Sequence, residues 1–175
     1  MIVQEGFDGL SMQKLAKQAA ISPSTIYVYF QSREDLLNQL YLDIQDQFET
    51  DALLNFSVEL SFADGLWLQW TNRLTNIIQD PLAFQFYEQF RNSPLINKLG
   101  PTRFRKTMQD FVERCVQRNE LKDLPAELFW ALAYGPFYTL VNFHLAQATM
   151  AGKPFLLTEQ TLRPAFELVL TALSY

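Results

Sequence analysis

Apolar residues recur at helical spacing along most of the chain. Near the start, an i, i+3, i+4, i+7 pattern predicts a short helix over residues 11–19. The residues of that pattern are Met12, Leu15, Ala16 and Ala19. Ser22 and Pro23 are residue types that begin helices, so a second short helix is expected after a break at residues 20 and 21. Two short helices joined by a tight turn are typical of a helix-turn-helix, whose second helix enters a DNA major groove.

The rest of the pattern predicts more helices and no strand. Ser32 and Asp35 form a capping box, which begins a helix that runs to about residue 50. A connection follows at residues 55–65. Later helices are expected at residues 66–78, 80–90, 104–115, 125–150 and 158–173. The predicted fold is all-α, with about nine helices.

The helix at residues 125–150 is apolar on nearly every side. Such a helix must be buried on every side, which one subunit of this size can hardly achieve, so a second subunit is expected. Gly135 and Pro136 fall in its middle and predict a kink. Pro164 predicts a kink in the last helix or a late start.

Composition indicates a globular chain and excludes several classes of protein. The 175 residues are 49% hydrophobic and 19% charged. Cys115 is the only cysteine, so no internal disulfide can form, which agrees with a reducing cytoplasm. His144 is the only histidine, so no histidine-based metal cluster is expected. The sequence contains neither a nucleophile-elbow, P-loop or dinucleotide-binding motif nor an apolar run of membrane-spanning length. We therefore expect no enzyme, metal site, cofactor or membrane span.

Charge is distributed unevenly. In residues 1–31, Lys14 and Lys17 are balanced by Glu5 and Asp8, whereas residues 32–60 carry a net charge of −6. A neutral head attracts phosphates weakly, so useful DNA affinity would require two heads in a dimer.

The segment SMQKLAKQAAISPSTIYVYFQSREDLL, residues 11–37, resembles the DNA-binding signature of the tetracycline-repressor (TetR) family of bacterial transcription regulators. The matching positions are Gly6–Phe7, Ser11, Leu15–Ala16, Ile21–Ser22, Thr25–Ile26–Tyr27, Tyr29–Phe30, Ser32–Arg33–Glu34 and Leu36–Leu37. The later stretch GPFYTLVNF resembles a Gly-Pro element of the same family. Family members usually have Gly, often in a left-handed conformation, where this chain has Ala20. They also have a full first helix. Here only its end is present, stopping near Gly6, so we expect this first helix to be incomplete and favour a longer natural chain.

The resemblance implies a domain division and sets of site residues. Residues 1–48 would be the DNA-binding domain, and residues 49–175 would bind an effector and dimerise. The DNA contacts implied are Ser11, Lys14, Ser22, Ser24, Thr25, Tyr27, Tyr29 and Arg33. Aromatic and sulfur-containing candidates for an effector pocket, which could equally be plain core, are Trp67, Trp70, Phe86, Tyr87, Phe90, Phe104, Met108, Phe111, Trp130, Tyr134 and Tyr138. Candidates for the dimer interface are Phe129, Phe137, Leu140, His144, Leu162, Phe166, Val169, Leu170 and Leu173.

The function implied is that of a cytoplasmic, homodimeric DNA-binding transcriptional regulator. It would act as a repressor on a double-stranded DNA operator, and a small apolar or amphipathic effector would release it. The alternative is a helical ligand-binding or interaction module that has lost DNA binding. The neutral head and the acidic segment behind it favour that alternative.

Overall fold

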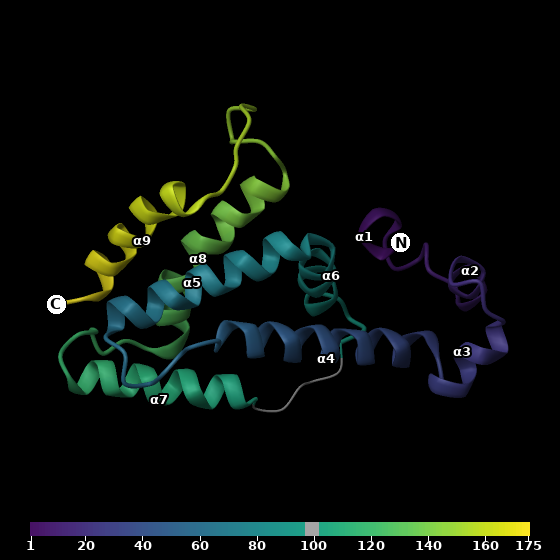
Figure 1. Cartoon of the computed structure of the whole chain (residues 1–175), viewed down its shortest axis with the longest axis horizontal. Coiled ribbons are helices and arrows are strands. Elements are labelled where there is room, and N and C mark those ends of the chain that lie inside the picture. The colour runs from purple at the N-terminus through teal and green to yellow at the C-terminus, as the bar shows by residue number, and fades with distance from the viewer. Residues whose placement is uncertain (97–101) are drawn as a thin grey trace. The chain divides into compact units, whose positions relative to one another are not determined.

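Nine α-helices form in the part of the chain that the computed structural model describes, residues 1–96 and 102–175 (Figure 1). Within those residues there is no strand, and Ala148 and Pro154 make a single antiparallel bridge. The all-α fold expected from the sequence is confirmed. None of the described helices combines the length and the apolar character that crossing a bilayer requires.

The helix bounds differ from expectation at a few termini. The helices are α1 Ile2–Glu5, α2 Met12–Gln18, α3 Pro23–Tyr29, α4 Arg33–Ala52, α5 Phe62–Gln79, α6 Pro81–Arg91, α7 Arg103–Gln117, α8 Ala126–Leu145 and α9 Glu159–Leu173. α5 begins earlier than predicted because the Ser61 hydroxyl accepts a hydrogen bond from the Asp64 backbone N–H at 3.1 Å. α8 stops at Leu145 instead of near residue 150, since Gln147 takes a left-handed conformation with φ 53°.

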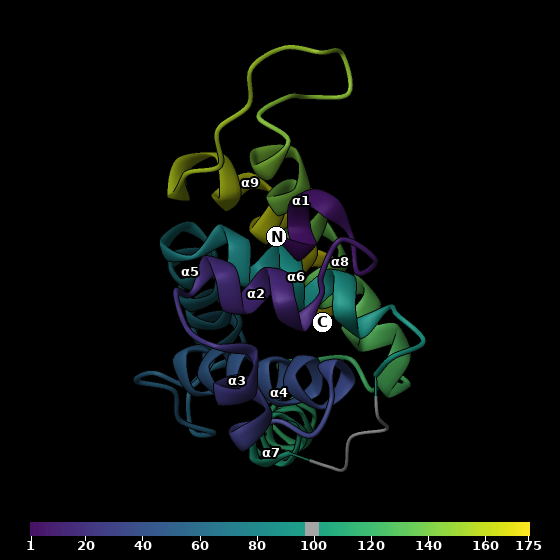
Figure 2. The same cartoon turned by 90° about the vertical axis from the view of Figure 1, so that its right-hand side faces the viewer.

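Proline does not end either of the last two helices. α8 continues through Pro136, and α9 begins at Glu159 and continues through Pro164. The start of α9 is fixed by reciprocal hydrogen bonds between Thr158 and Thr161, a capping box. A late start at Pro164 was therefore the wrong alternative. The connection from α8 to α9 extends away from the ends of both helices (Figure 2).

Contacts divide the chain into two compact units. The first comprises Met1–Glu49 with Ile77–Gly100, and the second comprises Thr50–Asn76 with Pro101–Tyr175. α6 thus belongs to the same unit as the N-terminal helices. The predicted division at residue 48 had placed it in the C-terminal part. The assignment of DNA binding to one part and effector binding to the other stays a prediction.

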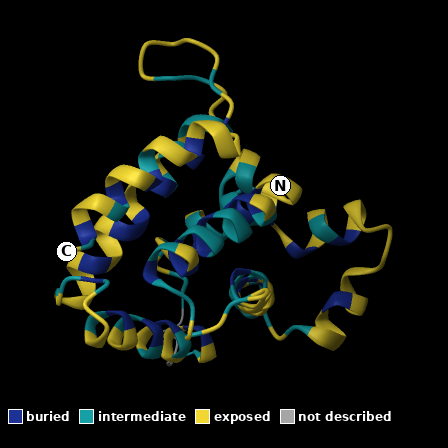
Figure 3. Ribbon diagram, turned by 60° about the vertical axis from the view of Figure 1, so that its left-hand side comes forward, coloured by how far each residue is buried: buried dark blue, intermediate teal, exposed yellow. Residues whose placement is uncertain are grey.

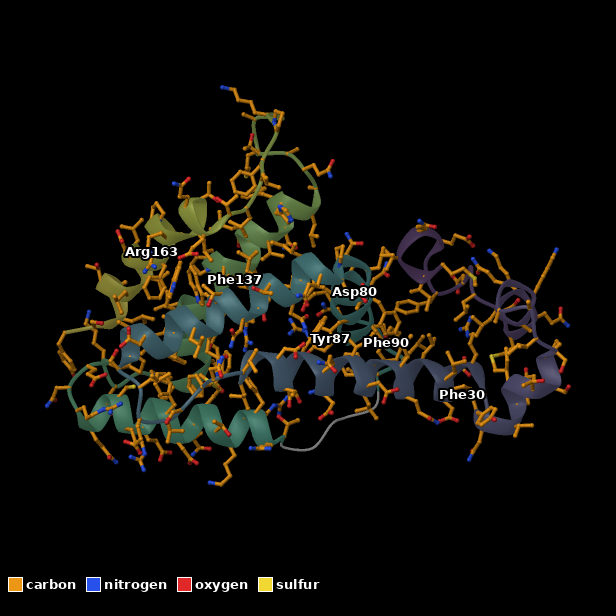
Figure 4. All side chains as sticks on the ribbon, viewed as in Figure 1. Phe30, Asp80, Tyr87, Phe90, Phe137 and Arg163 are labelled. Carbon is orange, nitrogen blue, oxygen red and sulfur yellow. The ribbon has the colours of Figure 1, made fainter. Side chains whose placement is uncertain are left out.

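The core of the first unit is aromatic and joins α1, α4 and α6. Tyr41 of α4 stacks on Tyr87 of α6 with ring centroids 5.0 Å apart, and Phe90 is fully buried beside them (Figure 4). A groove of about 460 Å³ lies in the same unit and is lined mainly by apolar side chains of these helices, among them Leu40 and Leu82.

The core of the second unit lies among α5, α7, α8 and α9. Trp70 is fully buried, and its indole N–H donates to the Ala133 carbonyl oxygen at 2.9 Å. The rings of Phe137 and Phe166 pack on Trp70 at 5.5 and 5.6 Å. The indole bond satisfies a polar group that would otherwise be buried without a partner.

Candidate nucleic-acid interface and effector region

Serine side chains cap both short helices of the predicted helix-turn-helix. The Ser11 hydroxyl accepts from the Lys14 backbone N–H at 3.1 Å, and the Ser22 hydroxyl accepts from the Thr25 backbone N–H at 3.2 Å. Pro23 follows Ser22 as the first residue of α3. These bonds satisfy N–H groups that have no partner inside the helix. The helix starts predicted from residue type are confirmed.

The turn between α2 and α3 is tight. Ala20 adopts a left-handed conformation with φ 55°, as the family resemblance implied for this position. The Ile21 backbone N–H then donates to the Ala16 carbonyl oxygen at 3.0 Å, which closes the turn. Below it, Met12, Ala16 and Ile26 form a small buried core. This core fixes how α3 packs on α2.

The outer face of α3 is open and partly aromatic. Ile26 is its one buried residue, whereas Tyr27 is 55% exposed and Tyr29 is 73% exposed. Ser24 and Thr25 are exposed as well, so the hydroxyls and rings share a solvent-facing helix (Figure 3). Neither tyrosine packs in the core. A helix with one buried anchor and an otherwise open surface can enter a DNA groove.

Lys14 is already paired within the head. Its ammonium group contacts the Glu5 carboxylate and also donates to the Gly9 carbonyl oxygen at 3.3 Å. The hydrogen bond from Lys14 holds the pKa of the Glu5 carboxyl below its ordinary value. Lys17 is exposed and makes no ion pair among the described residues. The head therefore has less free positive charge than its sequence suggests.

Arg33 has a structural role that the sequence did not reveal. Its guanidinium donates to the carbonyl oxygens of Phe7 at 3.1 Å and Leu10 at 3.2 Å. It also pairs with Glu34 at 3.3 Å, and 28% of its side chain is exposed. Arg33 thus joins the start of α4 to the segment between α1 and α2. Its implied phosphate contact stays a prediction.

Comparison with known proteins agrees with this geometry. The family model described as bacterial regulatory proteins, tetR family, matches residues 1–40. A crystal structure of a TetR family transcription regulator from Marinobacter aquaeolei superposes with a TM-score of 0.82 at 25% identity, covering 99% of this chain and 89% of that one. Residues 1–40 thus match the TetR family, and the chain as a whole is similar in fold to a TetR family regulator.

Two curated relatives match shorter stretches. An uncharacterized HTH-type transcriptional regulator of Haemophilus influenzae is 28% identical over 94 residues, 54% of this chain and 50% of that protein. A fatty acid metabolism regulator protein of Bacillus subtilis is 38% identical over 48 residues, 27% of this chain and 25% of that protein. The matches thus span half or less of the length of these relatives.

The side chains considered for an effector pocket do not form one cluster. Phe86, Tyr87 and Phe90 belong to the core of the first unit. In the second unit, Trp70, Met108 and Phe111 are at most 2% exposed and serve as core. Trp67 and Tyr138 are half-buried and pack on Phe166 and Phe137. The remaining three, Phe104, Trp130 and Tyr134, lie together at the edge of this unit's core.

Most side chains proposed for the dimer interface are buried within the single chain. Phe129, Phe137, Leu162, Phe166, Val169 and Leu173 are all at most 8% exposed. Leu140, Leu170 and His144 are half-buried, and His144 Nδ1 accepts from the Leu157 backbone N–H at 3.2 Å. The first six face inward because α8 and α9 pack on each other and on α5. The solvent-exposed side of α8 and α9 carries other apolar residues. These are Leu128, Leu132 and Leu168, at 44%, 42% and 73% exposure.

One polar residue near the second unit's core escaped the sequence analysis. Arg73 of α5 lies one turn before Ile77 and three residues after Trp70, within the apolar stripe of that helix. Its guanidinium lies over the rings of Phe104 and Tyr134. A cation inside an apolar stripe was the available signal, because charged residues are rarely placed there without a partner.

Proposed function

We propose that this chain is a DNA-binding transcriptional regulator. It acts as a homodimer in the cytoplasm, and it releases its operator when a small apolar or amphipathic effector binds in the second unit. The observation that carries the proposal is the capped helix α3, which keeps only Ile26 buried and leaves Tyr27 and Tyr29 to solvent. In a helix-turn-helix, this is the face that meets base edges and phosphates.

The small number of free cations supports the dimer. Lys14 and Arg33 both make contacts inside the head, so one head offers few groups for phosphate neutralisation. Non-specific DNA affinity rises with the number of phosphates contacted. Two heads on successive major grooves double those contacts and give the operator a two-fold symmetry.

The exposed side of α8 and α9 supports dimerisation through these helices. Leu128, Leu132 and Leu168 are exposed on these helices, so they lie on faces turned away from the second unit's core. Glutamate at Leu132 or Leu168 should shift the chain from dimer to monomer in sedimentation equilibrium. Leu54→Glu is the matched control, since Leu54 is 60% exposed in the α4–α5 connection and lies outside both helices. A dimer that survives both interface changes would contradict this interface.

DNA binding is tested by fluorescence anisotropy with duplexes from the regions flanking the coding sequence, at low and at physiological salt. The full chain should bind at least one duplex with nanomolar affinity, and Tyr27→Ala and Tyr29→Ala should weaken binding at least tenfold. Tyr175→Ala is the matched control, because Tyr175 is 77% exposed but lies at the end of the second unit. All three variants should unfold like the parent chain.

A second candidate function is an interaction module that no longer binds DNA. The internal pairing of Lys14 and Arg33 favours it, because phosphate attraction is then weak. Absence of binding at both salt concentrations would select this candidate. Binding that is unchanged in Tyr27→Ala and Tyr29→Ala would remove α3 as the reading surface.

A further inference from the structure

A half-buried arginine in the second unit lies against aromatic rings from two other helices. The guanidinium carbon of Arg73 in α5 lies 5.0 Å from the ring centroid of Phe104 in α7 and 5.1 Å from that of Tyr134 in α8. Trp130 completes the group by stacking on Tyr134 at 4.6 Å and lying 6.2 Å from Phe104. Rings stabilise the positive charge from their faces but accept no strong hydrogen bonds from it.

Two buried polar atoms of this cluster have no hydrogen-bond partner. Among the described residues, nothing accepts from Arg73 Nε, and nothing pairs with the hydroxyl of Tyr134. Arg73 forms no ion pair with a described carboxylate either. Tyr134 is only 2% exposed, so water cannot easily replace the missing partner. Buried polar groups of native proteins are nearly always hydrogen-bonded, and each exception calls for an explanation.

A comparison within the same unit shows what Arg73 lacks. Arg163 of α9 also stacks on an aromatic ring, with its guanidinium carbon 3.6 Å from the centroid of Trp67. Arg163, however, pairs with the Glu159 carboxylate at 3.7 Å. Of these two arginines on aromatic faces, Arg163 has a carboxylate partner and Arg73 has none among the described residues.

The unpaired groups define the chemistry of the missing partner. Arginine is a donor without acceptor capacity, and burial raises the pKa of Tyr134 to about 12, so its phenol remains a hydroxyl that can donate. A planar guanidinium matches a carboxylate, which accepts two parallel hydrogen bonds. One cation among aromatic rings balances one negative charge. Gln69, one turn earlier on α5, leaves an oxygen acceptor unpaired and does not belong to this donor set.

We propose that Arg73 and Tyr134 bind the carboxylate of a small organic acid whose aromatic or alkyl body packs against Phe104 and Trp130. Trp130 is 37% exposed, so the cluster reaches solvent at this ring. This inference rests on the proposed function in one respect, since it names the effector class of the regulator. The binding site itself does not depend on DNA binding.

Binding is tested on the full chain without DNA by titration calorimetry. Octanoate and phenylacetate are the probes, and octanol and octylamine are the neutral and cationic analogues. At least one carboxylate should bind, and its affinity should exceed that of either analogue at least tenfold. Equal binding of octanoate and octanol, or no binding of either carboxylate, would overturn the proposal.

Variants locate the bound carboxylate. Arg73→Met should lower the carboxylate affinity at least tenfold. Arg73→Lys should lower it several-fold, because lysine cannot donate the two parallel hydrogen bonds of a guanidinium. Tyr134→Phe should also lower it several-fold. Arg163→Met is the matched control and should bind as the parent does. Leu82→Ser, in the groove of the first unit, is a second control for binding elsewhere. Cooperative unfolding of each variant shows that it is folded. Full affinity in Arg73→Met and Tyr134→Phe would contradict the site.

The same samples separate this inference from the proposed function. Addition of the bound carboxylate to the DNA complex should release the duplex, and it should not do so in Arg73→Met. Carboxylate binding by a chain that binds no DNA would leave the site standing and refute the regulator. A chain that binds DNA but neither of the carboxylates would refute the site and leave the proposed regulator standing.

Discussion

The ring of Phe111 occupies the space next to Gly65 that any larger side chain would need. A Cβ placed on Gly65 would overlap the outer edge of that ring, and Phe111 is only 1% exposed. Gly65→Ala should therefore force the ring aside and lower the free energy of unfolding by about 1–3 kcal/mol. Urea unfolding followed by circular dichroism measures the change.

Gly135 provides the matched control for that substitution. It lies inside α8, and a Cβ there would meet nothing within 4 Å. Gly135→Ala should be neutral or raise the free energy of unfolding by up to about 1 kcal/mol, because alanine favours a helix interior. Equal effects at the two positions would mean that Phe111 does not constrain residue 65.

The left-handed turn residue predicts a stabilising substitution. Ala20 has φ 55°, a conformation that costs an alanine about 1–2 kcal/mol and a glycine little. Glycine also makes the unfolded chain more flexible, which removes part of the gain. Ala20→Gly should raise the free energy of unfolding by roughly 0.5–1 kcal/mol. Ala19→Gly should lower it, since Ala19 has an ordinary helical φ of −80°. A loss of stability in Ala20→Gly would contradict the strain.

Arg33 should contribute more to the free energy of unfolding than to DNA affinity. Arg33→Met removes the donor from the carbonyl oxygens of Phe7 and Leu10, and the free energy of unfolding should fall by about 1–3 kcal/mol. Arg33→Lys keeps the charge but loses the fork and should recover only part of that loss. The opposite result would be an Arg33→Met variant of unchanged stability whose DNA affinity depends less on salt, with a log–log slope reduced by about one. That result would make Arg33 a phosphate contact instead.

Two buried phenols predict a loss of stability in alkaline solution. Burial raises the pKa of Tyr134 to about 12 and also raises that of Tyr41. The unfolded chain then loses these protons first, at an ordinary pKa of about 10. Their contribution is complete below about pH 10 and is lost as pH rises toward the folded-state pKa.

The Tyr134 part of this effect can be isolated. Tyr134→Phe should remove up to about 3 kcal/mol of the alkaline loss and leave the part due to Tyr41. It should also stabilise the chain at neutral pH, because an unpaired buried hydroxyl is removed. Urea unfolding at several pH values measures both effects. An identical pH profile in parent and variant would show that Tyr134 is not buried as described.

Local signals in the sequence predicted much of the helical structure. Ser11, Ser22 and Asp80 each accept a hydrogen bond from a backbone N–H three residues later, as residues of these types commonly do before a helix. The tight turn at Ala20 followed in the same way from the short segment around it. Such features depend on neighbours a few residues away, so the sequence pattern contains them.

Features that depend on distant residues were not predictable in this way. The partners of Arg33 lie 23 and 26 residues earlier in the chain, and nothing near Arg33 indicates them. α8 is apolar all round, so its pattern does not show which side the chain itself covers. Phe129 and Phe137 were therefore placed at an interface, although they are buried within the chain.

The contact between Lys14 and Glu5 has a consequence for how the protein is distributed in a cell. Non-operator DNA vastly outnumbers any operator, and regulators rich in free cations spend most of their time on it. A head in which Lys14 is paired with Glu5 and, among the described residues, only Lys17 is free is held there only weakly. Most copies would then diffuse freely in solution. A modest number of molecules would then keep an operator occupied.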